Sequence, residues 1–253
     1  MAGAKTAYTP IQSRHNLGLA KGPVLKDIMK YRRLVGRLVY LTITRPDLVY
    51  SVHVLLQFVN EPKKEHCDAA LRVVRYVKRN PSKGITLNAS SDYQLRGFCD
   101  SDYAGCPVTR RSLSGYFVSI GGSPISWKVK KQVTVVKSTA EAEYRAMGSV
   151  TSELLWLKSF LVSLGVFHTN PMLMFCDNQA ALHISKNPVF HDRTKHIEID
   201  CHFVRQHLVS KVIKAHHVPS KEQIADLFTK ALGGESFDHL SYKLGLGLPR
   251  APT

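Results

Sequence analysis

Acidic residues are scarce in this sequence. Only 19 of its 253 residues are Asp or Glu, against 35 Lys and Arg, which gives a formal net charge of +16. This excess of positive charge favours a polyanionic partner, with nucleic acid as the first candidate and an anionic membrane as the second. Because carboxylates are so few, those that recur beside apolar strand segments require a specific explanation.

Cysteine pairs and long apolar runs are also lacking. The five cysteines are odd in number and never form Cys-x-x-Cys, which argues against a disulfide framework and favours a reducing compartment. No apolar run reaches the roughly 18 residues that span a bilayer, and the first residues lack the apolar segment of a signal peptide. We therefore expect an intracellular protein of the cytoplasm or nucleus that is not secreted and has no membrane partner.

Histidine, by contrast, occurs 12 times, and several copies gather late in the chain. The candidate zinc ligands of that region are His191, His196, Cys201, His202 and His207. Structural zinc sites usually contain a closely spaced cysteine pair, which this sequence lacks. We therefore expect a polar, partly solvated segment there and no zinc.

The spacing of apolar residues divides the chain into four parts. Residues 1–24 are rich in Gly, Pro and Lys and predict an extended lead-in. Residues 25–82 place apolar side chains three and four apart, which predicts helices. Strand-like and helix-like segments alternate over residues 83–233, and we expect residues 234–253 to be a C-terminal tail.

The third part predicts an α/β fold with a mixed sheet of five strands flanked by helices. Strands are predicted over Leu95–Cys99, Leu113–Ile120, Ile125–Val129, Met172–Cys176 and Val212–His216. Helices are predicted over Thr139–Leu164, Asn178–Ser185, Glu198–Val209 and Lys221–Ala231.

Four carboxylates occupy strand ends or helix starts in this part. Asp100 and Asp177 each end a strand, and ligands of open α/β sheets gather at such ends. Glu143 and Asp226 lie in the first turns of predicted helices. Asp102 shares the face of Asp100 in an extended strand, so it could assist or replace Asp100.

Helix capping separates the acids with a structural role from those that are free. Ser138-Thr-Ala-Glu141 has the spacing of a capping box, which occupies Glu141 and leaves Glu143 to face the sheet. Ser220-Lys-Glu-Gln223 repeats this spacing and leaves Asp226 free. Converging carboxylates repel one another unless a cation neutralises them, and hard oxygen ligands suit Mg²⁺ or Mn²⁺. Two such ions can promote phosphodiester hydrolysis.

Two histidines, His216 and His217, end the last predicted strand. A histidine near a metal site can carry a proton to or from water or product. His217 lies nearer the following loop and is the preferred candidate, but the sequence leaves the choice between the two open.

Long segments of the chain resemble the C-terminal part of copia-type retrotransposon Pol polyproteins, where the end of the reverse transcriptase is followed by a ribonuclease H domain. Matching segments include Tyr31–Thr42, Cys99–Gly105, Ser138–Tyr144, Cys176–Ala181, His191–Asp200 and Gln223–Lys230. The resemblance implies a ribonuclease H-like domain over residues 83–233, preceded by a small helical thumb or connection region over residues 25–82. It also implies cleavage of the RNA strand of an RNA/DNA hybrid with two Mg²⁺ or Mn²⁺ ions. The implied metal ligands are Asp100, Glu143, Asp177 and Asp226, and the implied catalytic histidine is His217.

The resemblance also implies contacts to nucleic acid. Asn178 and Gln179 are candidates to contact 2′-hydroxyl groups, although helix capping explains them equally well. Candidates for phosphate contacts are Lys128, Lys130, Lys131, Lys137, Arg193 and Lys195. We find no Tyr-x-Asp-Asp tetrad of the family's polymerase site and expect no DNA polymerase activity, which makes the upstream polymerase region a candidate partner. The chain is then a truncated copy or a piece of a larger polyprotein.

Three other functions compete with this interpretation. A folded but non-catalytic hybrid-binding remnant would carry the same residues and differ only in activity. Integrase and transposase nucleases order their acids Asp, Asp, Glu, whereas Glu143 precedes Asp177 here. A basic membrane-surface protein would need an amphipathic helix with one basic and one bulky apolar face, and no such helix dominates the sequence.

Overall fold

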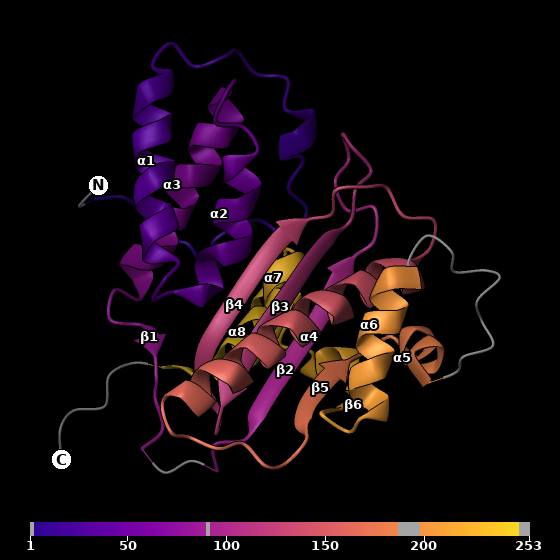
Figure 1. Cartoon of the computed structure of the whole chain (residues 1–253). Helices are drawn as coiled ribbons and strands as arrows, with labels where there is room; N and C mark the ends of the chain where they lie inside the picture. Colours follow the sequence, from indigo (N-terminus) through magenta and orange to yellow (C-terminus); the bar gives the residue numbers. More distant parts are fainter. Residues whose placement is uncertain (1–2, 90–91, 187–197, 248–253) are drawn as a thin grey trace. The chain divides into compact units, whose positions relative to one another are not determined.

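The chain forms two compact units, one of Leu87–Thr229 and one that joins Met1–Thr86 to Lys230–Thr253. The computed structural model describes residues 3–89, 92–186 and 198–247 (Figure 1). Within the described residues, no helix combines the length and the apolar character needed to cross a bilayer.

The Leu87–Thr229 unit is built on one mixed sheet of five strands. The strands are β2 (Leu95–Asp102), β3 (Leu113–Ile120), β4 (Ser123–Lys131), β5 (Met172–Cys176) and β6 (Ile213–His217). Their order is β4-β3-β2-β5-β6, antiparallel from β4 to β2 and parallel from β2 to β6. The predicted mixed five-stranded sheet is therefore confirmed. The carboxyl ends of β2, β5 and β6 meet at one edge because these strands run in the same direction.

Helices flank this sheet on both faces. The long helix α4 (Thr139–Ser163) packs across β2, β3 and β5, with α5 (Gln179–Lys186) and α6 (Glu198–Val209) beside it, and the short α7 (Asp226–Thr229) covers the other face (Figure 1). Apolar side chains of α4, including Met147, Val150 and Leu154, are fully buried against Met172 and Met174 of β5. The apolar face of α4 thus holds the sheet and fixes which α4 residues approach its carboxyl edge.

Capping fixes where α4 begins. The Glu141 N–H donates to the Ser138 hydroxyl at 3.1 Å, which confirms Ser138 as the N-cap. In an ideal capping box the Glu141 carboxylate would accept from the N–H of the N-cap residue Ser138. Here it accepts instead from the N–H of Lys137, one residue earlier, at 2.9 Å. Glu141 is occupied structurally, as predicted from its spacing.

The prediction of a helix over Lys221–Ala231 is wrong. A 3₁₀ turn at Ser220–Glu222 is followed by an extended Gln223 and only then by α7. The Gln223 side chain is fully buried, donates to the Cys99 carbonyl at 2.9 Å and accepts locally from the Ala225 N–H at 3.2 Å. A contact with the sheet and a bond just ahead of α7 thus replace the predicted capping box.

The other unit is mainly helical. Its elements are α1 (Ile28–Leu41), α2 (Val49–Leu56), α3 (Lys64–Arg79), α8 (Gly234–Lys243), the 3₁₀ turns Leu17–Leu19 and Pro46–Leu48, and the paired strands β1 (Gly84–Ile85) and β7 (Leu246–Gly247). Residues 234–247, expected in a tail, form α8 and β7, and Phe237 and Leu240 of α8 are buried. The described part of the predicted lead-in, residues 3–24, contains no helix or strand beyond the 3₁₀ turn, and its Ile11 and Leu17 pack in the core of this unit.

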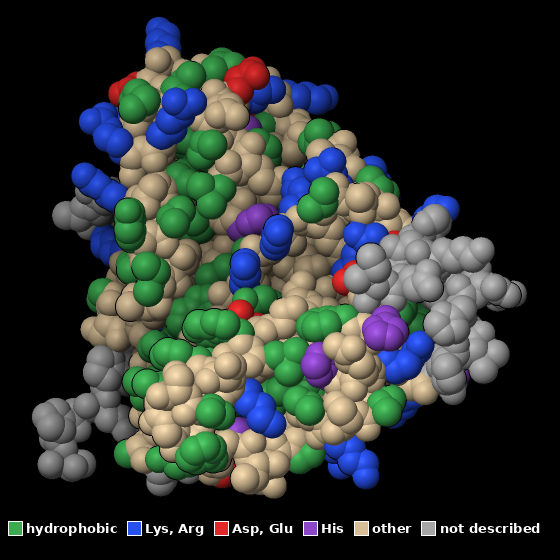
Figure 2. Space-filling model, in the orientation of Figure 1, with side chains coloured by type: hydrophobic (Ala, Val, Ile, Leu, Met, Phe, Trp, Pro, Cys, Tyr) green, Lys and Arg blue, Asp and Glu red, His purple; other side chains and the backbone are tan. Residues whose placement is uncertain are grey.

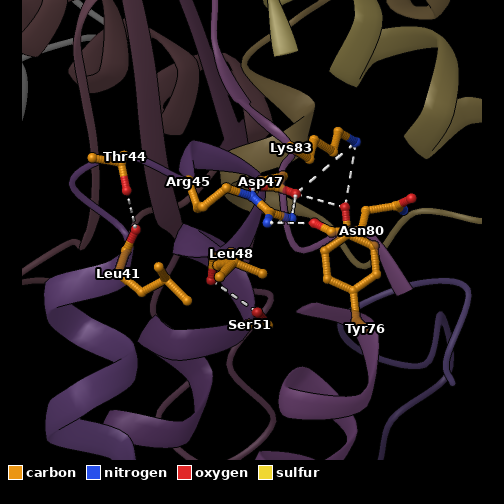
Figure 3. A network of polar contacts seen from close by, with 9 residues as sticks. All are labelled: Leu41, Thr44, Arg45, Asp47, Leu48, Ser51, Tyr76, Asn80 and Lys83. Atoms are coloured by element: carbon orange, nitrogen blue, oxygen red, sulfur yellow. Dashed lines mark hydrogen bonds and ion pairs between the residues drawn. The ribbon is translucent and has the colours of Figure 1, made fainter. Parts of the chain in front are cut away.

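A buried polar network joins the start of α2 to α3 in this unit (Figure 3). Asp47 accepts from two nitrogens of Arg45, at 3.0 and 2.8 Å, and from the Tyr76 hydroxyl at 2.5 Å. Arg45 also donates to the Asn80 carbonyl at 3.1 Å, at the end of α3. The Asp47 charge is therefore paired and fully hydrogen-bonded, as a buried carboxylate requires.

The charge imbalance is visible on the molecular surface. On the face drawn in Figure 2, Lys and Arg side chains are far more numerous than Asp and Glu. Several of the few acids are instead buried, among them Asp47, Asp100, Glu143 and Asp226.

Candidate active site

Asp100 lies near the carboxyl end of β2 and is almost fully buried. The Thr229 hydroxyl of α7 donates a short hydrogen bond to its Oδ2. The Gln223 side chain binds the carbonyl of Cys99, the residue before it. Two residues from the segment after β6 therefore fix the position of Asp100 from the face opposite α4.

Asp177 follows β5 directly and is half-buried. Because β5 is parallel to β2, with Phe175 opposite Phe98, Asp177 and Asp100 reach the same edge of the sheet. The Ser220 hydroxyl donates to Asp177 Oδ2 at 2.7 Å. Ser220, predicted as a helix cap, is thus a partner of a candidate metal ligand.

Glu143 faces the sheet from α4, as its spacing from Glu141 predicts. Its side chain is buried, and its Oε1 accepts from the Ser101 N–H at 3.3 Å. Burial is the main cause that raises the pKa of Glu143 to about 10, and the charges of Asp100, Cys176 and Asp177 add to it. Without a cation, this carboxyl group therefore holds a proton at neutral pH.

Asp226 is the first residue of α7 and is buried. The approach of α7 to the sheet depends on Gly115 of β3, because a Cβ at that position would lie 2.8 Å from side-chain atoms of Phe228 and Thr229. Any larger residue at position 115 would push α7, and Asp226 with it, away from β2.

These four acids converge at one edge of the sheet. One carboxylate oxygen from each of Asp100, Asp177 and Asp226 lies within 4.8 Å of the other two. A second set, made of ligand atoms from Glu143, Cys176 and Asp177, meets the same limit. The structure thus brings together all four carboxylates selected from the sequence, with Asp177 common to both sets. Such a cluster of oxygen ligands suits hard divalent cations.

The two histidines of β6 lie in different surroundings. The half-buried His216 stacks on Phe175, with ring centroids 5.7 Å apart, and burial is the main cause that lowers its pKa. His217 is exposed and pairs with Cys176 in register, one residue from Asp177. It belongs to neither ligand set. The choice of His217 over His216 therefore stays a prediction.

The candidate nucleic-acid ligands are dispersed. Asn178 caps α5, since its Oδ1 accepts from the Ala181 N–H at 2.9 Å, while Gln179 is exposed. Lys128 and Lys130 are exposed on β4, Lys137 is exposed before α4, and Lys131 is half-buried with its Nζ 3.1 Å from Cys106 Sγ. Arg193 and Lys195 lie outside the described residues.

Sequence reasoning missed Thr229 and assigned Gln223 and Ser220 the wrong role. Thr229 lies three residues after Asp226, on the same helical turn. This spacing is the one sequence feature that could have identified Thr229 as a neighbour of the site. For Gln223 and Ser220 the capping-box spacing favoured a local role. Gln223 does accept from the nearby Ala225 N–H, but both side chains also bind distant residues, on β2 and after β5. Such long-range contacts have no counterpart in local spacing.

Two retrotransposon polyproteins align with most of this chain. The chain is 41% identical over 246 residues to the retrovirus-related Pol polyprotein from transposon RE1 of Arabidopsis thaliana, an alignment that covers 97% of this chain and 17% of the polyprotein. It is 34% identical over 253 residues to that from transposon TNT 1-94 of Nicotiana tabacum, covering 97% of this chain and 19% of the polyprotein. The chain therefore spans less than one fifth of the length of these relatives.

No family model matches the sequence. Among solved structures, the N-terminal RNase H domain of rv2228c from Mycobacterium tuberculosis aligns with a TM-score of 0.39 and 15% identity, over 60% of this chain and 98% of that one. Independently of that alignment, the Leu87–Thr229 unit contains the mixed five-stranded sheet that was predicted within residues 83–233.

Proposed function

Because this chain belongs to the Pol polyproteins of copia-type retrotransposons, we propose that its Leu87–Thr229 unit is a ribonuclease H that cleaves the RNA strand of RNA/DNA hybrids. The observation that carries the proposal is the convergence of Asp100, Asp177 and Asp226, with Glu143 beside them, at the carboxyl edge of the sheet. The helical unit is then the thumb or connection region, and the polymerase region of a longer polyprotein is its proposed partner.

The residues of the site fit divalent cations of the Mg²⁺ or Mn²⁺ type. The three aspartates supply hard oxygen donors within 4.8 Å of one another. Glu143 is buried close to them, and burial, together with the charges of Asp100, Cys176 and Asp177, raises its pKa to about 10. Asp100, Asp177, Asp226 and Glu143 would hold two such ions. When bound, the ions supply activation of the attacking water and stabilisation of the leaving 3′ oxygen.

The residues around the carboxylates orient them. The Thr229 hydroxyl donates to Asp100 Oδ2, and the Ser220 hydroxyl donates to Asp177 Oδ2. Gln223 anchors the segment that carries Asp226 to the β2 backbone. Outer-shell bonds of this kind fix ligand geometry and are as much a part of a metal site as the ligands themselves.

His217 is proposed as the group that exchanges protons with solvent. It is exposed at the carboxyl end of β6, so it can take up or release a proton without opening the core. Histidine is the side chain that most often serves as a general acid or base, which suits proton transfer to a leaving group or from water.

The basic surface is proposed to hold the hybrid. Lys128 and Lys130 extend from β4 with the alternation that places both on one face of the strand, and Lys137 precedes α4. Such side chains neutralise phosphates and position a duplex without reading its sequence. Asn178 is occupied as a helix cap, so Gln179 is the better candidate to contact a 2′-hydroxyl group.

The test uses the full chain and a hybrid whose RNA strand carries a 5′ label. With Mg²⁺, we expect internal cuts in the RNA that leave 3′-hydroxyl ends, no cut in the DNA strand or in duplex DNA, and loss of cleavage in EDTA. Asp226→Asn should abolish the cuts. Tight hybrid binding with no cleavage in either Mg²⁺ or Mn²⁺ would instead identify a non-catalytic remnant and overturn the proposal.

A further inference from the structure

The tripeptide Phe-Cys-Asp occurs twice, at the carboxyl ends of two neighbouring parallel strands. It spans Phe98–Asp100 in β2 and Phe175–Asp177 at the end of β5, and the copies are in register because Phe98 pairs with Phe175. The two phenylalanine rings stack at 4.7 Å with an interplanar angle of 18°. Alternation along a strand then directs both cysteines to the opposite face, beneath α4, immediately before the two aspartates.

Cys176 lies among potential metal ligands. Its thiol is fully buried, and its Sγ is 4.0 Å from Glu143 Oε2. Ligand atoms of Cys176, Glu143 and Asp177 all lie within 4.8 Å of one another. The backbone N–H of Asn178 donates to the same sulfur at 3.4 Å. An amide N–H directed at a sulfur stabilises negative charge on it, as the outer-shell bonds of metal sites do for their ligands.

This set differs in chemistry from the all-oxygen set of Asp100, Asp177 and Asp226. Mg²⁺ takes oxygen ligands and discriminates against sulfur, whereas Zn²⁺ and related borderline-soft ions bind thiolate together with carboxylate. We propose that Cys176, Glu143 and Asp177 form a binding site for a thiophilic divalent cation of the Zn²⁺ class. The ion takes the place of the thiol proton, which is released to solvent.

The sequence predicts no zinc only on the basis of local spacing, because the histidine-rich segment from His191 to His207 is not accompanied by a Cys-x-x-Cys pair. The ligands of the proposed site are Glu143 on α4, Cys176 at the end of β5 and Asp177 directly after it. Glu143 precedes Cys176 by 33 positions and Asp177 by 34. A zinc motif defined by short spacings cannot identify such a set.

The thiophilic site overlaps the proposed catalytic one, because Asp177 belongs to both ligand sets. An ion held by Cys176 would withdraw Asp177 and Glu143 from the ions that support hydrolysis. Zn²⁺ is therefore an inhibitor of Mg²⁺-supported cleavage. This consequence rests on the proposed function, whereas binding of the ion does not.

Binding is tested with Cd²⁺ as a spectroscopic probe of thiolate ligation in the full chain. We expect an ultraviolet sulfur-to-cadmium charge-transfer band that saturates at one ion per chain and disappears on addition of Zn²⁺. Cys176→Ser should lose the band, and Cys106→Ser, which removes a half-buried thiol outside the set, should keep it. Asp177→Asn keeps the thiol and should weaken Cd²⁺ binding about tenfold or more. A band retained in Cys176→Ser, or no band in the wild type, would overturn the proposal.

A second measurement separates this proposal from the proposed function. Zn²⁺ is titrated into a hybrid-cleavage reaction in Mg²⁺, and each variant is compared with its own rate without Zn²⁺. Half-inhibition of the wild type and Cys106→Ser should need at least about tenfold less Zn²⁺ than that of Cys176→Ser. If the charge-transfer results hold but no variant cleaves the hybrid, the proposed function fails and the thiophilic site stands. Equal inhibition of Cys176→Ser and wild type contradicts the overlap.

Discussion

The backbone N–H of Ser101 donates to the Glu143 carboxylate at 3.3 Å. This bond ties α4 to the residue that follows Asp100, so two acids separated by 43 positions share one buried site. Burial, and after it the charges of Asp100, Cys176 and Asp177, raise the pKa of Glu143 to about 10. The site is thus arranged for a cation at the expense of stability without one.

Replacing Glu143 by Gln should stabilise the metal-free protein at neutral and alkaline pH. Between its ordinary pKa of 4.5 and the raised value of about 10, Glu143 binds a proton in the folded state but not in the unfolded state. The free energy of unfolding of the wild type therefore falls as pH rises through this window. At pH 7.5 the cost is about 2 to 4 kcal/mol, which Glu143→Gln removes. Urea unfolding in EDTA at pH 5, 6.5 and 8 measures the difference.

The control for this experiment is Glu141→Gln, two positions away on the same helix. That change weakens a capping bond and an ion pair with Arg145, so it should lower stability slightly at each pH. Stability profiles of wild type and Glu143→Gln that stay parallel from pH 5 to 8 would refute the assignment of a buried, protonated Glu143.

Thr229→Val should reduce cleavage without unfolding the protein. Valine keeps the buried volume but removes the hydroxyl that orients Asp100. We expect a roughly 10- to 100-fold lower rate and a higher Mg²⁺ concentration at half-maximal rate, because loss of an outer-shell bond weakens metal affinity by that order. Thr229→Ser, which keeps the hydroxyl, should recover most of the activity. An unchanged Mg²⁺ dependence in Thr229→Val would show that the bond is only structural.

Local pattern was sufficient to identify much of this fold. The helix over Thr139–Leu164 and the five strands were predicted from apolar periodicity, and α4 ends one residue earlier than expected. Glu143 was separated from Glu141 by their angular positions on one helix, and both faces are as predicted. These features depend on residues close in sequence, where spacing alone fixes geometry.

The segment after β6 could not be predicted in this way. The capping-box spacing of Ser220 and Gln223 favoured a helix, but each side chain binds a residue that is distant in sequence, Asp177 and Cys99 respectively. The fully buried contact of Gln223 with the sheet outweighs local capping, which contributes only about 1 kcal/mol, whereas the Ser220–Asp177 bond is exposed. Thr229 was missed for the same reason, because its partner Asp100 lies 129 positions away in the sequence.

The lysines of β4 should carry part of the salt dependence of hybrid binding. The log–log slope of affinity against salt is about −0.9 per phosphate contact on a B-form duplex. Lys128→Ala combined with Lys130→Ala should therefore flatten the slope by about 1 to 2 and weaken binding at low salt. The matched pair Lys211→Ala with Lys214→Ala, exposed at and just before β6, should leave it unchanged. Equal slopes for both pairs would exclude β4 from the interface.

Asp47→Asn should destabilise the helical unit strongly. The change removes the charge that pairs with the buried Arg45 and accepts from Tyr76 (Figure 3). Breaking one partner of a buried ion pair costs about 3 to 5 kcal/mol, since the other charge stays uncompensated. Tyr76→Phe, which removes a single hydrogen bond to a charged group, should cost only about 1.5 to 3 kcal/mol. Chemical denaturation followed by circular dichroism distinguishes the two losses.

The central claim is that the acids at the carboxyl edge of the sheet hydrolyse RNA in a hybrid. Its most direct test compares Asp100→Asn with Asp102→Asn, two changes on the same strand, in a hybrid-cleavage assay with Mg²⁺ and a parallel binding assay. Asp100 belongs to the three-aspartate set and Asp102 does not. We predict that Asp100→Asn lowers the cleavage rate by at least about 10³-fold while hybrid binding persists, and that Asp102→Asn cleaves within about tenfold of wild type. Cleavage by Asp100→Asn at the wild-type rate would contradict this account.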